Sequence, residues 1–252
     1  MKLFYFKFSL ALFFSALLGF TLSAQPGCPS VNAGSDITLP CGTTCTNLTA
    51  TYFETGGAAT YTVGSIPYTP FPYNAGTSVI VNQDDVWSTV IDLPFTFCFF
   101  DQHYTQAVIG ANGLVSFDIT EANQTCVYDM SGLGTLPNNA LYTNCIMGPY
   151  HDIDPSLGGT IKYQITGSAP CRTFVVSFNN IPMYDSNDPT SNCSSTTDAT
   201  HQIVLYETTN VVEIYIKDKE ACTDWISGKS IEGIQNAAGT VGYAVPGRNN
   251  TV

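Results

Sequence analysis

The sequence predicts an all-β protein, an antiparallel β-sandwich or open barrel with long disulfide-linked loops. Short runs rich in β-branched and aromatic residues alternate with glycine- and proline-containing turns along the chain. The pair Asn112-Gly113 joins two apolar runs, which favours a β-hairpin because both residues tolerate positive φ. No amphipathic pattern extends beyond about two helical turns, so packed helices are not expected.

The chain begins with a segment typical of a secretion signal, predicted to span residues 1–24. Met1–Lys7 carries two lysines and no acid, Phe8–Phe20 is almost wholly apolar, and small residues at 23 and 24 precede a Gln-Pro pair. A membrane anchor is one alternative, but a bilayer span needs roughly 20 apolar residues. A lipid anchor on Cys28 is another, although the preceding residues lack the usual Leu-small-small pattern. The signal predicts a secreted or cell-surface protein.

All nine cysteines follow this segment, and an oxidising compartment favours their pairing. An odd number leaves at least one thiol that is free, pairs with another chain or has its partner outside this sequence. We predict the disulfides Cys41 with Cys45 and Cys193 with Cys222, because each pair links segments that could flank a hairpin. Zinc binding by Cys41-x3-Cys45 is the alternative, but no second close pair or Cys/His cluster completes such a site.

Charge narrows the range of partners. Only 11% of the residues are charged, and removal of residues 1–24 leaves 6 basic against 20 acidic residues, a formal charge of −14. Such a surface repels phosphate, so neither nucleic acid nor an anionic membrane is an expected partner. An extracellular protein or a glycan is expected instead. No later stretch is long and apolar enough for a membrane span.

The strands are predicted as short runs, with a proline-rich loop at residues 66–73. These runs cover residues 37–39, 48–52, 60–63, 90–93, 95–100, 107–109, 114–117, 159–165, 172–178, 202–206 and 211–216. The last run has the clearest pattern, because Val212, Ile214 and Ile216 alternate with Glu213 and Tyr215. This alternation indicates a strand with one buried side.

Several motifs follow one another in a recognisable order. They are Phe95–Phe100, Val108–Phe117 with its Asn-Gly turn, Gly148–Asp154 and Gly159–Tyr163. Together they resemble the nidogen-like extracellular domain. The opening Val31–Asp36 is similar to the start of Ig/PKD-like modules in secreted Bacteroidetes proteins.

The resemblance implies a domain organisation. Residues 25–55 would form Ig/PKD-like leader strands and residues 56–252 a nidogen-like β domain, unless the two make one continuous domain. The combination is similar to the N-terminal region of large surface proteins that end in a gliding-motility-associated, type IX secretion sorting domain. This sequence reaches residue 252 without such a domain, so we expect a fragment of a longer protein that lacks its last strand.

The segment His151–Asp154 offers the best cluster of functional atoms. In an extended chain Asp152 and Asp154 leave the same face, and with carbonyl groups near Gly158-Gly159 they could hold calcium, which prefers oxygen ligands. We therefore predict a calcium site at Asp152 and Asp154, with no other cofactor. The structural alternative is that Asp154 begins a turn and Asp152 accepts backbone N–H groups.

Other acidic positions in loops are interpreted as solvated. They are Asp84-Asp85 and the acids of residues 185–188. The polar stretch 187–198 is expected to form a surface loop and a variable contact surface.

Aromatic residues gather near the proline-rich loop and suggest a contact surface. The predicted surface consists of Tyr68, Phe71, Tyr73 and Trp87. Exposed aromatic rings can stack on sugars or anchor a partner protein. The alternative is that this loop packs across one end of the sandwich.

The sequence carries no catalytic signature. The histidines His103, His151 and His201 are far apart, and the chain has no Gly-x-Ser-x-Gly elbow, His-Glu-x-x-His pair or phosphate loop. We therefore predict a non-catalytic, adhesin-like module for protein or glycan contact within a larger secreted protein. The alternative is a secreted carbohydrate-active enzyme or its binding domain, because two carboxylates can serve a glycosidase.

Overall fold

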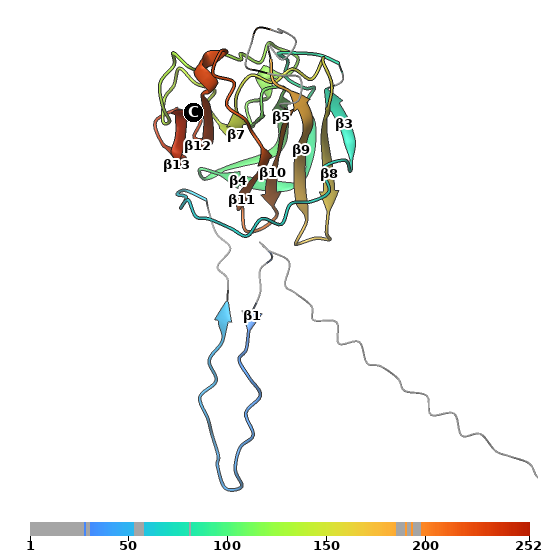
Figure 1. The fold of residues 1–252 in the computed structure, drawn as a ribbon. Coiled ribbons are helices and arrows are strands. Elements are labelled where there is room, and N and C mark those ends of the chain that lie inside the picture. Colours follow the sequence, from blue (N-terminus) through green and yellow to red (C-terminus); the bar gives the residue numbers. More distant parts are fainter. Residues whose placement is uncertain are drawn as a thin grey trace, which may run out of the picture.

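The computed structural model describes residues 28, 31–52, 58–80, 82–184, 190, 193 and 198–252. Two antiparallel sheets pack face to face, so the all-β prediction is confirmed and the fold is a sandwich (Figure 1). In these residues the only helical elements are the 3-10 turns η1, Ile119–Glu121, and η2, Ile226–Gly228. None of the described segments forms a helix with the length and apolarity of a membrane span. The predicted signal at 1–24 lies outside the described residues.

One sheet has six strands in the order β13-β12-β7-β6-β5-β4. Their bounds are β4 Ile91–Phe99, β5 Gln102–Gly110, β6 Leu114–Ser116, β7 Cys145–Tyr150, β12 Ser230–Gln235 and β13 Gly242–Thr251. The other sheet has five strands in the order β11-β10-β9-β8-β3. Their bounds are β3 Thr77–Ile80, β8 Thr160–Thr166, β9 Thr173–Pro182, β10 Asp198–Tyr206 and β11 Val212–Asp218.

The strand predictions hold where the apolar runs are long. Residues 90–93 and 95–100, predicted as two strands, belong mainly to the single strand β4. The predictions at 37–39 and 60–63 are wrong, because neither segment pairs with another strand. In the two large sheets four strands were not predicted: β3, β7, β12 and β13.

A third, two-stranded sheet lies near the start of the described chain. It pairs β1, Val31–Asn32, with β2, Thr51–Tyr52. Figure 1 shows this hairpin as an arm that extends away from the sandwich, and residues 33–50 are exposed throughout. The interpretation of residues 25–55 as an Ig/PKD-like leader stays a prediction.

The main core fills the space between the two sheets. Strand β4 shows how the sequence builds it, because every second residue from Ile91 to Phe99 is buried whereas Asp92 and Thr96 are exposed. From the opposite sheet β9 contributes Phe174 and Phe178 to the same cluster. Full burial of each such side chain stabilises the fold by about 1.5–3 kcal/mol.

The outer face of the five-stranded sheet is covered by the proline-rich loop. In Figure 1 this segment crosses over β11, β10 and β9 before it reaches β3. The backbone N–H of Phe71 donates to Oε1 of Gln202 at 3.0 Å, and Nε2 of Gln202 donates to the Phe71 carbonyl at 2.8 Å. Tyr215, predicted on the outer face of its strand, is therefore buried as well.

A second core cluster covers the outer face of the six-stranded sheet. Side chains from the connection between β6 and β7 pack there against Trp87, Val108 and Met147. All six residues of β7 are consequently buried, on both faces of the strand. A strand buried on both faces shows no alternation of apolar and polar residues.

The structure contains two disulfides, which join Cys193 to Cys222 and Cys28 to Cys171. The first matches the prediction, and the second was not considered. The predicted disulfide between Cys41 and Cys45 is wrong, because both thiols are free and exposed in the arm. Cys98, Cys126 and Cys145 are free and buried, so apolar packing accounts for them.

Candidate metal centre

The first part of the candidate site is the loop that follows β3. Asp85 has φ of 49°, a conformation that few non-glycine residues adopt, and its N–H donates to Oδ1 of Asp84 at 2.9 Å. The N–H of Cys126 donates to the Asp85 carbonyl at 2.8 Å. Both carboxylates are therefore fixed in position, and both are half-buried.

The second part is Asp152, which follows β7 directly. Its side chain is only 4% exposed. Oδ2 accepts a hydrogen bond from Nε1 of Trp225 at 2.7 Å, whereas Oδ1 is buried and has no hydrogen-bond partner among the described residues. A buried oxygen without a partner costs free energy, and a bound cation would remove this cost.

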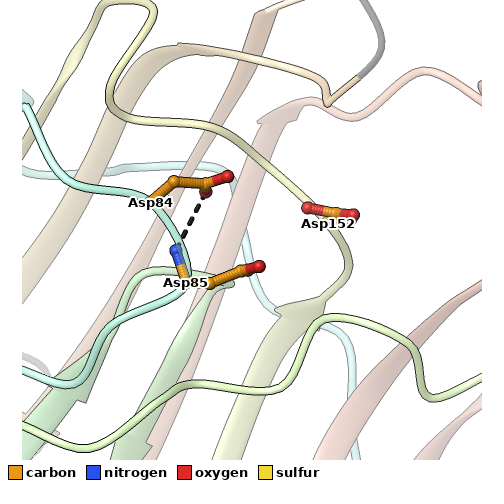
Figure 2. Close-up of side chains that lie close together, drawn as sticks. All are labelled: Asp84, Asp85 and Asp152. Atoms are coloured by element: carbon orange, nitrogen blue, oxygen red, sulfur yellow. Dashed lines mark hydrogen bonds between the residues drawn. The ribbon is translucent and has the colours of Figure 1, made fainter.

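The fold brings these two parts together. One carboxylate oxygen from each of Asp84, Asp85 and Asp152 lies within 4.8 Å of the others. We call these three residues the acidic triad; Figure 2 shows the Asp152 carboxylate beside those of Asp84 and Asp85. Carboxylate oxygens grouped in this way suit a hard cation such as Ca²⁺.

Asn112, from the predicted Asn-Gly turn, links the two parts of the site by hydrogen bonds. Its Nδ2 donates to Oδ1 of Asp85 at 2.9 Å and to the Cys126 carbonyl at 3.0 Å. Its Oδ1 accepts the N–H of Ile153 at 3.2 Å. Asn112 is fully buried, so one side chain connects both acidic segments through a satisfied network.

The electrostatics of the triad favour a bound cation. Burial, followed by the charges of Asp85 and Asp154, raises the pKa of Asp84 to about 7. Burial also raises the pKa of Asp85 and brings that of Asp152 to about 8, where the Trp225 hydrogen bond opposes the rise. In the described part of the chain no ion pair engages the triad. A divalent cation would offset this repulsion.

The structure groups Asp152 with Asp84 and Asp85 rather than with Asp154. Oδ1 of Asp154 accepts from the N–H of Ser156 at 2.8 Å and from its hydroxyl at 2.5 Å. Asp154 thus begins a turn, as in the structural alternative, and lies outside the triad. Asp84 and Asp85, interpreted from their sequence context as solvated, are the carboxylates that lie beside Asp152. The acids at 185 and 188 lie outside the described residues, as does most of the predicted surface loop at 187–198.

The predicted aromatic surface is also corrected. Trp87 is 2% exposed and belongs to the second core cluster, and Phe71 packs on the outer face of the five-stranded sheet. Tyr68 is 54% exposed, and its hydroxyl lies 2.9 Å from that of Tyr73. The alternative, that this loop packs across the sandwich, describes Phe71 and Trp87 better.

A different aromatic group borders the triad. Tyr128, Tyr184 and Trp225 have ring centroids 4.7–6.4 Å apart. This group could not be predicted from the sequence, because its members come from three distant segments that meet only in the folded chain.

The fold and the site together define a disulfide-bonded β-sandwich module with an acidic site at its loops, consistent with an extracellular location. A family model described as NIDO related matches residues 59–252. The protein belongs to the NIDO-related family, and the resemblance to the nidogen-like domain is confirmed at that level. Comparisons with curated proteins and with solved structures gave no match.

Proposed function

We propose that the protein is a non-catalytic, adhesin-like extracellular module that binds Ca²⁺ at the acidic triad and contacts a protein or glycan. The observation that carries the proposal is the carboxylate of Asp152, whose buried Oδ1 has no partner among the described residues and which lies beside two further carboxylates. Membership of the NIDO-related family supports the extracellular setting.

Calcium fits the donor set better than other common cations. The triad offers only oxygen atoms, whereas typical zinc sites include sulfur or nitrogen ligands. Magnesium requires near-ideal octahedral geometry and keeps several waters, whereas calcium accepts irregular shells of six to eight oxygens. Calcium sites in extracellular modules typically have Kd values of about 10⁻⁴ to 10⁻³ M.

Calorimetric titration of the whole protein with CaCl₂ tests the proposal. We expect one site, and calcium at about ten times Kd should raise the free energy of unfolding by about 1.4 kcal/mol. Asp84→Asn and Asp152→Asn should each weaken binding by at least about tenfold. The calcium-free variants should remain folded, because amides relieve repulsion between carboxylates.

Two matched variants serve as controls. Asp92→Asn removes a charge from an exposed position on β4 and should leave calcium binding unchanged. Asp154→Asn keeps an oxygen that can cap Ser156, and it should reduce affinity by less than about threefold. Loss of binding in Asp154→Asn with retention in Asp84→Asn would instead support the site predicted from the sequence. The absence of any calcium binding would refute the proposal.

A second candidate function is hydrolysis of a carbohydrate. The carboxylate oxygens of the triad lie within 4.8 Å of one another, close to the about 5–5.5 Å that separates the two carboxyl groups of retaining glycosidases. A polysaccharide hydrolysis screen separates the two functions. Hydrolysis that is abolished by Asp152→Ala would establish the enzyme, whereas binding without turnover supports the contact module.

The proposed setting is a larger bacterial surface protein with a type IX secretion sorting domain. This part of the proposal is supported by the order of the sequence motifs alone. The downstream reading frame in the source DNA tests it, because the proposal expects a sorting domain to be encoded there. An in-frame stop after residue 252 together with a stably folded product would contradict it.

A further inference from the structure

Three aromatic rings form a partly exposed group beside the acidic triad. Tyr128 and Tyr184 are 38% and 37% exposed, and their ring planes differ by only 10°. Trp225 lies 6.1 Å from Tyr128 and 4.7 Å from Tyr184, measured between ring centroids. We call these three residues the aromatic platform.

The platform is attached to the triad at three points. Nε1 of Trp225 donates to Oδ2 of Asp152. The N–H of Tyr184 donates to the Asp152 carbonyl at 3.4 Å. Tyr128 follows a segment that is held to the Asp85 carbonyl by the N–H of Cys126. The position of the rings therefore depends on the position of the triad.

A disulfide fixes the third ring independently. The N–H of Trp225 donates to the Cys222 carbonyl at 3.2 Å, and Cys222 is bonded to Cys193. This arrangement presents the indole without requiring a ligand, which lowers the entropic cost of binding.

We propose that the aromatic platform and the calcium-loaded triad together bind a saccharide. The inference rests on the proposed calcium site and names the ligand class of that site. Sugars present apolar C–H faces that pack on aromatic rings, and hydroxyl groups that bind carboxylates or coordinate a calcium ion. The platform supplies the rings, and the calcium-loaded triad supplies the carboxylates and the ion. The two are joined by the hydrogen bond between Trp225 and Asp152.

A neutral ligand fits this surface better than a cationic peptide does. Aromatic rings beside carboxylates can attract Lys or Arg side chains, but a calcium ion neutralises two of the three charges of the triad. What remains is an apolar surface with an oxygen-coordinating ion at its border, and this combination favours a polyhydroxylated ligand.

A glycan array probed with the whole protein, in calcium and in EGTA, tests the inference. The oligosaccharide that binds best is then used for calorimetric titration of the variants. Tyr128→Ala and Tyr184→Ala should lower saccharide affinity by at least about tenfold while calcium affinity stays unchanged. Tyr68→Ala, at an exposed tyrosine within the proline-rich loop, should change neither. Asp152→Asn should lower both the calcium and the saccharide affinity by at least about tenfold.

The outcomes separate this inference from the proposed function. If calcium fails to bind, the proposed function is wrong. If calcium binds but no glycan does, or if the platform variants keep full saccharide affinity, the saccharide inference alone is overturned. Binding of oligolysine that is lost in Tyr128→Ala would also overturn it, in favour of a cationic ligand.

Discussion

The indole Nε1 of Trp225 donates a 2.7 Å hydrogen bond to Oδ2 of Asp152, and the same carboxylate lies beside those of Asp84 and Asp85. One carboxylate therefore belongs to two structures, the proposed calcium site and the aromatic platform. A change at Asp152 or at Trp225 should therefore be measurable at both structures. Trp225 is well suited to report such a change, because the chain has only two tryptophans and the other one, Trp87, is buried in a core cluster.

Trp225→Phe removes this hydrogen bond while keeping an aromatic ring. In EGTA the buried carboxylate loses its only donor among the described residues, so the free energy of unfolding should fall by about 1.5–3 kcal/mol. Saturating calcium should reduce this loss, because the ion stabilises the same carboxylate. Urea unfolding in the two buffers measures both values. Equal losses with and without calcium would show that the hydrogen bond acts apart from the site.

The disulfide between Cys193 and Cys222 should contribute strongly to stability. It closes a loop with a sequence separation of 29, and replacement of both cysteines by serine should cost about 2–4 kcal/mol through greater freedom of the unfolded chain. Thermal unfolding measures the effect. The matched control replaces Cys41 and Cys45, which are free and exposed, and should stay within about 0.5 kcal/mol of the parent. A peptide bridging Cys41 to Cys45 in a non-reduced digest would contradict the structure.

The sequence predicted strands well where one face is buried. Along β4 the odd positions fill the main core, and of the even positions Asp92 and Thr96 are exposed whereas Cys98 is buried. Strand β7 was missed because both of its faces are covered, so its residues show no period. Strand β12 is likewise buried throughout. Burial on both faces did not hide every strand, because residues 202–206 of the equally buried β10 were predicted from their apolar run.

Of the three residues of the acidic triad, only Asp152 was predicted as a ligand. The sequence identified Asp152, because the His151–Asp154 segment concentrates polar atoms, but it paired Asp152 with its sequence neighbour Asp154. In the structure Asp154 caps its own turn, and the partners of Asp152 come from a loop about 70 residues earlier in the chain. Contacts over such a separation depend on the packing of the two sheets and have no local signal. Asn112 was predicted as a turn residue, yet its link between the acidic segments emerged only from the fold.

Gly113→Ala should be severely destabilising. Gly113 has φ of 86°, and an added Cβ would collide with the Pro149 carbonyl oxygen and lie 3.1 Å from Nε2 of His201. Strain and steric overlap together should cost at least about 3 kcal/mol, measured by chemical unfolding. Gly42→Ala is the matched control, since its φ of 93° is similar but nothing lies within 4 Å of the added Cβ. It should cost only about 1–2 kcal/mol. Equal costs would mean that backbone strain alone decides the effect.

The last prediction concerns His201, which is fully buried on β10 with its ring stacked 4.4 Å from that of Phe178. Burial, followed by the nearby His151, whose ring is 5.9 Å away, holds the pKa of His201 well below its ordinary value. Burial, followed by the charge of Lys219, in turn lowers the pKa of His151.

The folded protein therefore keeps His201 neutral, whereas the unfolded chain takes up a proton below about pH 6.5. Stability should consequently fall as the pH drops through that value. His201→Phe removes this contribution, so its stability should decrease by about 1.4 kcal/mol less than that of the parent between pH 7.5 and pH 5.5. Urea unfolding in EGTA at both pH values measures the difference. Asp84 and Asp152 also titrate in this range, but their contribution is common to both proteins and cancels in the comparison. Identical pH dependence of the two proteins would show that His201 becomes protonated without unfolding.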